Sequence, residues 1–235
     1  MSIIMEQNQT GLFGKIPAHG DFIERNLQRS FTLQWDDWLQ RCIASSREQL
    51  GENWLDIYLT SPIWRFSLST GSVDSLAWSG ILMPSVDSVG RYFPLTIAQP
   101  VSGNTNPFDF LTENNKWYES VEQVALSALQ SNLTADDLIQ ALHQIESAHD
   151  CSPKASSQVT ILNNGAAIST EKGNVEATYA KLLHYTLSPQ SESQSLWWSR
   201  GSQIMSPTML NTKGLPGSEQ FSAFLDGNWE RHKNL

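Results

Sequence analysis

Cysteine is scarce in this sequence. The only two, Cys42 and Cys151, lie far apart, and neither has a second thiol near it in the chain. A disulfide framework and a thiolate metal site both need clustered thiols, so the sequence predicts neither. Chains without such frameworks are typical of reducing compartments, and we therefore expect a cytoplasmic protein.

Basic side chains and long apolar runs are also in short supply. The sequence has 15 Lys and Arg against 24 Asp and Glu, a formal net charge of -9. Because nucleic acids and anionic membrane surfaces attract basic patches, this balance argues against both as partners. No apolar run approaches the length of a membrane span, and the N-terminal "MSIIMEQNQTG" lacks the basic and apolar parts of a secretion signal.

Large apolar side chains, by contrast, are plentiful. Hydrophobic residues make up 40% of the 235 residues, with 9 Trp and only 17% charged residues. Such a composition predicts a globular fold with a sizeable core rather than disorder. The length is compatible with one large domain or with a domain plus a smaller appendage. We expect a single domain over residues 1–235, in which residues 11–100 hold most of the long motifs discussed below, residues 105–150 a helical middle and residues 157–235 a C-terminal α/β part.

In several segments of the chain, apolar residues recur at the spacing of a helix. The segment "SFTLQWDDWLQRCIASSREQLG" has one apolar stripe, ends at Gly51 and is predicted to bury Phe31, Trp35, Trp38, Leu39, Cys42 and Leu50. Two further helices are predicted in "KWYESVEQVALSALQ" and "TADDLIQALHQIESA", the second with Thr134 as N-cap. A helix is also predicted in "VEATYAKLLHYTL", between the short strands "VTILN" and "LWWSR".

Three strand-like runs follow the first helix, namely "IWRFSLS", "LAWSGILM" and "RYFPLTIAQ". Their turns suit an antiparallel meander, and Pro94 favours an edge or bulged position for the third run. Because strands and helices come in separate blocks, the pattern predicts a mixed α/β protein of the α+β class, with an antiparallel or mixed β-sheet flanked by α-helices on its faces.

The stretch "GLFGKIPAHGDFIER" has the composition of a phosphate-binding loop. A P-loop needs four residues between its glycines and a hydroxyl after its lysine, whereas here two residues separate the first glycines and an isoleucine follows Lys15. The glycine pattern of dinucleotide sites is absent as well. For Asp21, followed three residues later by Glu24, the spacing favours a helix N-terminal capping box over a catalytic carboxylate.

Other polar and aromatic residues are candidate sites. Asp87 and Arg91 flank Gly90 in "PSVDSVGRYFPL", where they predict either an ion pair that fixes a loop or a partner contact. If "LWWSR" is a strand, Trp197 and Trp198 point to opposite faces, so we expect one in the core and the other in a partner contact. The cluster in "HQIESAHDC" lacks the spacing of a zinc helix and is interpreted as a solvated helix end.

Longer segments carry a family resemblance. The chain resembles the TagF family, accessory proteins of bacterial type VI secretion systems, in "GLFGKIPAHGDFIERNL", "WDDWLQRCIASSREQLGENWLDIYLTSPIWRFSLS", "WSGILMPSVDSVGRYFPL", "LWWSRGS" and "GLPGSEQFSAFLDGNW". The resemblance implies a sheet flanked by helices. It also implies a cytoplasmic regulator that holds secretion off after translation by acting on the forkhead-associated scaffold protein of the apparatus, with no catalysis. We expect no cofactor either, on the spacing of potential ligands.

The family supplies no catalytic residues to carry over. Its motif positions transfer with their role left open, namely Gly14, Lys15, Gly20, Asp21, Asp87, Gly90 and Arg91. Of these we expect a structural role for Gly14, Gly20, Asp21 and Gly90. The residues expected in contact with the partner are Lys15, His19, Asp87, Arg91, Trp197 and Trp198. Two alternatives stay open. In one, the chain is a structural accessory subunit of the secretion machine. In the other, it is a hydrolase-like enzyme whose cleft is lined by His19, Asp21, Asp87 and Arg91.

The spacing of potential ligands predicts that the purified protein holds no stoichiometric metal or nucleotide. Elemental analysis and the ultraviolet absorbance spectrum, on protein purified without a tag, should both show none. One equivalent of zinc or of nucleotide per chain would contradict this expectation.

Overall fold

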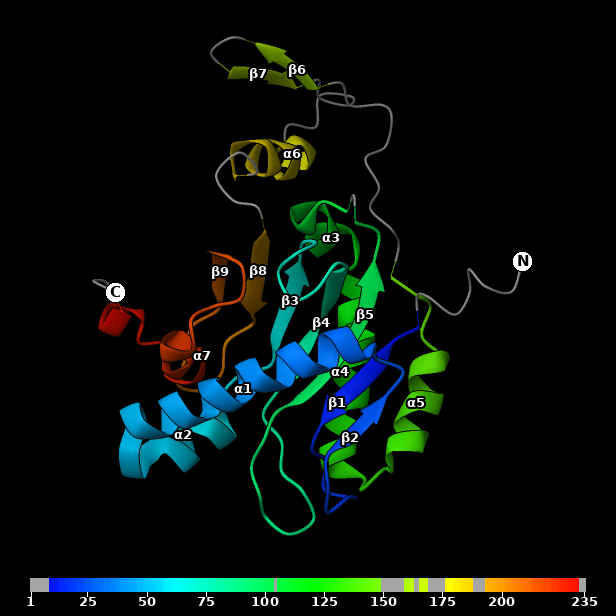
Figure 1. Ribbon diagram of the computed structural model, residues 1–235, viewed down its shortest axis with the longest axis vertical. Coiled ribbons are helices and arrows are strands. Elements are labelled where there is room, and N and C mark those ends of the chain that lie inside the picture. Colours follow the sequence, from blue (N-terminus) through cyan, green and yellow to red (C-terminus); the bar gives the residue numbers. More distant parts are fainter. Residues whose placement is uncertain are drawn as a thin grey trace.

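The structure of the protein, a computed structural model, describes residues 9–103, 105–148, 159–162, 165–168, 176–187 and 193–232. Figure 1 shows a central sheet with helices on both sides. The loop predicted at residues 149–158 and most of the one predicted after residue 187 lie outside the described residues. Within the described ranges, no helix is long and apolar enough to cross a membrane.

Seven strands form one antiparallel sheet in the order β2-β1-β5-β4-β3-β8-β9. Their bounds are Gly11–Gly14 (β1), Ile23–Arg25 (β2), Trp64–Leu68 (β3), Ala77–Met83 (β4), Leu95–Val101 (β5), Gln194–Ser199 (β8) and Thr208–Lys213 (β9). Strands β6 (Val159–Leu162) and β7 (Gly165–Ile168) pair with each other in a separate hairpin. The pairing confirms the predicted meander of β3, β4 and β5.

Helices cover both faces of the sheet, with α1 on one face and α4 on the other (Figure 1). The helices are Arg29–Leu50 (α1), Trp54–Thr60 (α2), Pro107–Glu113 (α3), Asn115–Gln130 (α4), Ala135–His143 (α5), Glu176–Leu187 (α6) and Phe221–Asp226 (α7). Because side chains alternate along each strand, the two faces bury separate cores. Phe66 and Trp197 join α1, α2 and α7 in one core, while Leu12 and Trp198 join α3, α4 and α5 in the other. The predicted α+β class is confirmed.

Helix α1 buries the apolar stripe that its sequence period predicts. The buried side chains of this stripe include Phe31, Trp35, Trp38, Leu39 and Cys42. The ring of Trp35 stacks against Phe31 and Trp197, with ring centroids 5.0 and 6.0 Å apart. Its indole N–H donates a hydrogen bond to the Thr96 hydroxyl at 2.8 Å. The helix is thereby fixed to two strands of the sheet, β5 and β8.

Local signals predict helix ends better than strand positions. Thr134 caps α5 and forms a capping box with Asp137, as its sequence indicates, and Gly51 follows α1 with a φ of 56°. The predicted edge position of the third strand is wrong. Strand β5 lies between β1 and β4, and Pro94 does not interrupt its pairing, since the strand starts at the next residue, Leu95.

The expectation of one exposed tryptophan on β8 is also wrong. Trp197 and Trp198 point to opposite faces, but Trp197 is fully buried and Trp198 is only 8% exposed. Helices cover both faces of the sheet at this strand, so alternation sends each indole into a core. Both side chains are therefore packing residues and are not available to a partner.

We expect Trp35→Ala to lower the free energy of unfolding by about 3 to 5 kcal/mol, the usual cost of truncating a large buried aromatic side chain. The change also leaves the Thr96 hydroxyl, at 0% exposure, without its donor. Urea denaturation measures the effect. Leu33→Ala is the control, because Leu33 lies on the same helix and is 58% exposed; equal midpoints for both variants would show that the stripe is not part of the core.

Candidate functional site

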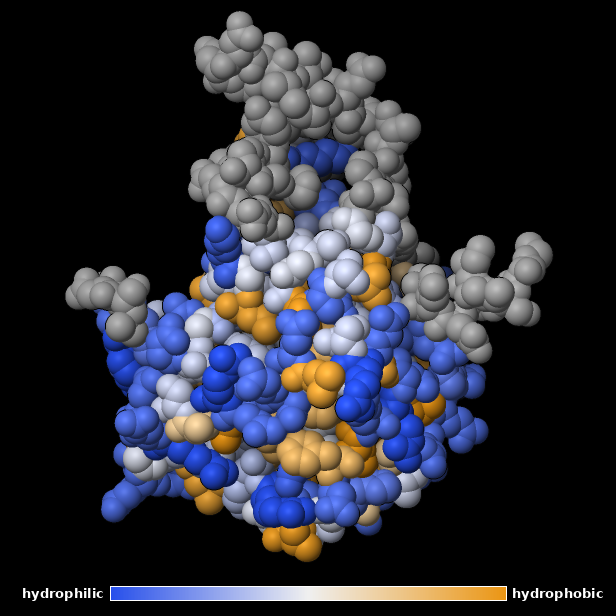
Figure 2. Space-filling view, viewed as in Figure 1, coloured by the Kyte–Doolittle hydropathy of each residue, from blue (hydrophilic) through white to orange (hydrophobic). Residues whose placement is uncertain are grey.

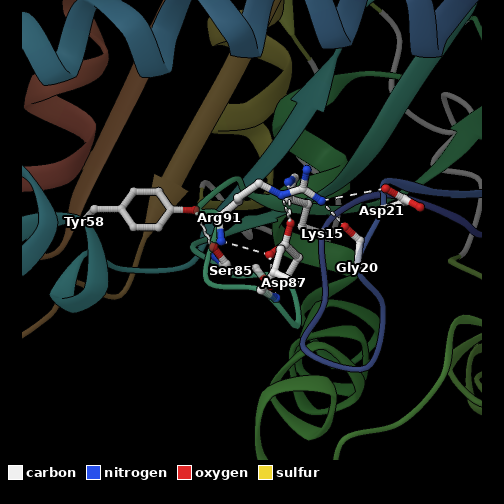
Figure 3. Close-up of polar contacts among 8 residues, drawn as sticks. Lys15, Gly20, Asp21, Tyr58, Ser85, Asp87 and Arg91 are labelled. Carbon is white, nitrogen blue, oxygen red and sulfur yellow. Dashed lines mark hydrogen bonds and ion pairs between the residues drawn. The ribbon is translucent and has the colours of Figure 1, made fainter.

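Two loops meet at one end of the sheet because β1 and β5 are antiparallel neighbours. Residues 15–22 follow β1 and residues 84–94 precede β5, so the pairing of Phe13 with Thr96 sets the loops side by side. Figure 3 shows the polar contacts that join them. Most predicted site residues lie on these loops, namely Lys15, His19, Gly20, Asp21, Asp87, Gly90 and Arg91. The two tryptophans of β8 do not, since β4 and β3 separate that strand from β5.

The carboxylate of Asp87 is the centre of the loop contacts. Its side chain is 0% exposed. Oδ2 accepts from Lys15 Nζ at 2.6 Å and from Arg91 Nε at 2.7 Å, and Oδ1 accepts from the backbone N–H groups of Arg91 at 2.8 Å and Val89 at 3.0 Å. Burial alone would raise the pKa of Asp87, but the hydrogen bonds from Lys15, Arg91 and Val89 outweigh it and hold that pKa well below its usual value. Asp87 is therefore ionised at neutral pH.

The turn around Asp87 is a tight hairpin connection. Val86 and Tyr92 form an antiparallel bridge, and inside it the Asp87 N–H donates to the Arg91 carbonyl at 3.1 Å. Gly90 donates its N–H to the Asp87 carbonyl at 3.1 Å and has a φ of 84°. A short connection that ends in a left-handed residue favours glycine at that place. Gly90 therefore shapes the turn that presents the next residue, Arg91.

Gly14 and Gly20 allow the two loops to approach closely. A β-carbon at Gly14, whose φ is 132°, would lie 2.0 Å from the Pro94 carbonyl oxygen. At Gly20 it would lie 3.3 Å from Ser88 Oγ. The Ser88 N–H also donates to the His19 carbonyl at 3.0 Å. Backbone contacts thus join the loops in addition to the ion pairs.

Lys15 and Arg91 differ in what they leave to solvent. Lys15 is 5% exposed, and its ammonium lies 4.9 Å from the centre of the Phe22 ring. It is a buried support rather than the contact residue that the sequence predicted, and the same holds for Asp87. The Arg91 side chain is 56% exposed and lies 3.7 Å from the carboxylate of Asp21. Its Nη2 also donates to the carbonyl oxygen of Gly20.

The capping box predicted at Asp21 is wrong. The chain enters strand β2 at Ile23 instead of a helix, and the Asp21 side chain is fully exposed. The pairing of β2 with β1 is a contact between chain segments that local spacing does not reveal. Packing favours it, since Phe22 lies against the rings of Phe13 and Phe93, with ring centroids 5.9 and 4.8 Å apart.

His19 fastens helix α5 to the loops. Its Nε2 accepts a hydrogen bond at 3.1 Å from the backbone N–H of Ala135, the first residue of α5. Arg25 of β2 pairs with Asp136 of α5 at 2.9 Å. Both contacts hold α5 against this end of the sheet.

Sequence reasoning missed Tyr58, Phe22 and Val89. The Tyr58 hydroxyl donates to the Ser85 carbonyl at 3.0 Å and accepts from the Ser85 N–H at 2.9 Å, so α2 holds the base of the 84–94 loop. Burial raises the pKa of Tyr58, which therefore stays protonated. Phe22 and Val89 are 48% and 69% exposed. Single apolar residues in loops give no periodic signal, and their exposure in the fold is what identifies them.

The depressed pKa of Asp87 predicts how stability depends on acid. An aspartate in the unfolded chain titrates near pH 4, so the stabilisation from ionised Asp87 is complete above that pH and is lost as the pH falls below it. Asp87→Asn should flatten this acid limb, which means that the free energy of unfolding should fall less steeply as the pH drops. At neutral pH it should lower the free energy of unfolding by about 3 to 5 kcal/mol, because Lys15 is left buried without its partner. Urea midpoints at several pH values measure both effects.

The control for this experiment is Asp37→Asn, since the Asp37 side chain is 68% exposed on α1. This substitution removes the same charge without disturbing a buried ion pair, so it should leave both the acid limb and the neutral midpoint close to those of the wild type. An acid limb that Asp87→Asn leaves unchanged would contradict the assignment.

Comparisons with known proteins agree on one family. Residues 11–145 match the sequence model of a family described as TagF N-terminal domain, Type VI secretion system-associated. The crystal structure of PA0076 from Pseudomonas aeruginosa PAO1 resembles this one with a TM-score of 0.78 and 34% identity, over 94% of this chain and 95% of that chain. A search of curated proteins found no match. Because the family match spans both loops and more than half of the sequence, the chain belongs to the TagF family of type VI secretion-associated proteins.

Proposed function

We propose that this TagF protein is a post-translational negative regulator of bacterial type VI secretion. It acts in the cytoplasm and without catalysis, by binding the forkhead-associated scaffold protein of the apparatus. The observation that carries the proposal is the surface formed by the two loops, where exposed side chains stand on a rigid, buried ion-pair network.

The loop surface consists of the exposed side chains of Asp21, Phe22, Val89 and Arg91. Phe22 and Val89 are 48% and 69% exposed, and the Arg91 side chain is 56% exposed. Figure 2 shows apolar and polar groups side by side on this part of the molecule, below helix α1. Apolar anchors next to an arginine are typical of protein-binding hot spots. The buried contacts hold Arg91 in place, which lowers the entropy cost of binding a partner.

The contacts of the polar residues support a non-catalytic role. A general base needs a lone pair that can reach a substrate proton, whereas His19 Nε2 already accepts from α5 and the Asp87 oxygens accept from four donors. Ser222 lies 3.2 Å from His232, but its hydroxyl is fully buried and donates to Gln49 at 2.6 Å. Among the described residues, no group of three or more His, Cys, Asp or Glu could hold a metal ion.

Arg91→Ala should abolish repression without unfolding the protein. Asp87 keeps Lys15 and two backbone donors after this change, so the melting temperature should stay close to that of the wild type. Truncating an arginine hot spot costs about 2 kcal/mol or more of binding, roughly 30-fold in Kd. We expect cells that carry the variant to secrete constitutively, and a pull-down with it to lose the forkhead-associated scaffold.

The matched control for this experiment is Arg41→Ala. The Arg41 side chain is 63% exposed and pairs with Asp37 at 2.8 Å on α1, so the change removes the same charge from a comparable exposed pair. It should leave repression and the pull-down intact. If Arg91→Ala folds, represses and retains the scaffold, the loop surface is not the docking site. If the wild-type protein does not retain the scaffold, the proposed function itself is wrong.

A further inference from the structure

We propose that the loop surface recognises a carboxylate. An Asp or Glu side chain of the scaffold protein, flanked by an apolar residue, binds Arg91 and displaces Asp21 from it. The inference rests on the proposed function and adds the chemistry of the contact. In the free protein, Asp21 weakly occupies the position that the partner's carboxylate takes in the complex.

The charges of the loops leave one positive charge that is not compensated by a buried group. Lys15 and Arg91 share a single buried acid, Asp87, at 2.6 and 2.7 Å. Apart from Asp87, the ion pairs of the described residues give Arg91 one further partner, Asp21. That carboxylate is fully exposed and 3.7 Å away, a geometry in which ion pairs are weak. A carboxylate from a partner can therefore replace it.

The guanidinium of Arg91 is held in one orientation with part of its edge open. Nε donates to Asp87, and Nη2 donates to the carbonyl oxygen of Gly20. In the part of the chain that the structure describes, no hydrogen bond is made by Nη1. The planar fork of an arginine matches the two oxygens of a carboxylate. A carboxylate that binds both Nη atoms would take the place that Asp21 now holds.

Apolar side chains beside Arg91 define what flanks the carboxylate. Phe22 is half-exposed and rests on the rings of Phe13 and Phe93. Val89 lies at the tip of the opposite loop, where its backbone N–H is bonded to Asp87. An apolar residue of the partner packed on Phe22 and Val89 would exclude water from the ion pair and strengthen it. The surface therefore fits an acidic side chain next to an apolar one.

The formal net charge of -9 does not oppose such a contact. Charges more than about 8 Å apart in water are largely screened at physiological ionic strength. The repulsion between an acidic partner and distant carboxylates is therefore small, and the local positive charge of Arg91 decides which side chain is accepted.

Asp21→Asn tests the sign of the partner's charge. The substitution removes the competing carboxylate at nearly constant shape, so the Kd of the recombinant forkhead-associated scaffold, measured by calorimetry, should fall about two- to fivefold. A scaffold that contacts Asp21 through Lys or Arg would bind the variant more weakly. An unchanged or raised Kd overturns the inference. Asp37→Asn is the control, because it removes the same charge from an exposed pair on α1 and should leave the Kd unchanged.

Two substitutions at Val89 also test the sign of the partner's charge, and they leave Asp21 unchanged. Val89 is 69% exposed, so Val89→Lys and Val89→Glu should both fold, and both lose the same apolar contact. A carboxylate on the partner predicts that Val89→Lys binds about tenfold more tightly than Val89→Glu. Equal or reversed affinities overturn the inference while the proposed function stands. Wild-type protein that does not bind the scaffold overturns the proposed function, and the inference falls with it.

Discussion

The geometry of the site depends on burying one carboxylate. Asp87 is out of contact with water, and an unpaired ion there would cost several kcal/mol, so folding has to bring donors to both of its oxygens. Three donors come from its own turn, the backbone N–H groups of Val89 and Arg91 and the Arg91 guanidinium, but the ammonium of Lys15 comes from a segment 72 residues away in the chain. The contact with Lys15 therefore depends on the pairing of β1 with β5. Arg91 is the exposed end of this arrangement.

A second buried ion pair shows what a purely structural arginine looks like in the same fold. Arg65 of β3 is 3% exposed and donates from Nε and Nη2 to the two oxygens of Glu122 at 2.6 and 2.8 Å. Its Nη1 donates to Asn115 at 2.6 Å, so every nitrogen of this guanidinium has an acceptor and α4 is tied to the sheet. Arg91 is held by Asp87 and the Gly20 carbonyl in a similar way, but among the described residues its Nη1 has no acceptor. Arg65 thus has an acceptor for every nitrogen and serves packing, whereas Arg91 is the arginine to which the proposed function assigns a partner contact.

Features that depend on neighbouring residues were predictable from the sequence, whereas those that depend on distant pairing were not. The stripe of α1 and the Thr134 cap follow from spacings within one or two helical turns, and the meander follows from its turns. The spacing at Asp21 gave a wrong answer, because pairing of β2 with β1 overrides it. The alternation of side chains along a strand predicted that Trp197 and Trp198 lie on opposite faces of the sheet. It could not reveal that helices cover both faces. The contact of Lys15 with Asp87 could not be predicted without knowing the order of the strands in the sheet.

Both oxygens of Asp87 already accept hydrogen bonds, and this limits the chemistry that the loop surface can perform. Accepting a proton would disrupt its contacts with Lys15 and Arg91, and the depressed pKa expresses that cost, so Asp87 is a poor proton carrier near neutral pH. A carboxylate that the hydrolase-like alternative puts in its cleft is thus used to position its neighbour. What the surface offers to another molecule is a half-exposed guanidinium and two exposed apolar side chains on the same two loops. Surfaces of this kind are typical of sites that select a partner by shape and charge, which supports the proposal that the output of this one is binding rather than turnover.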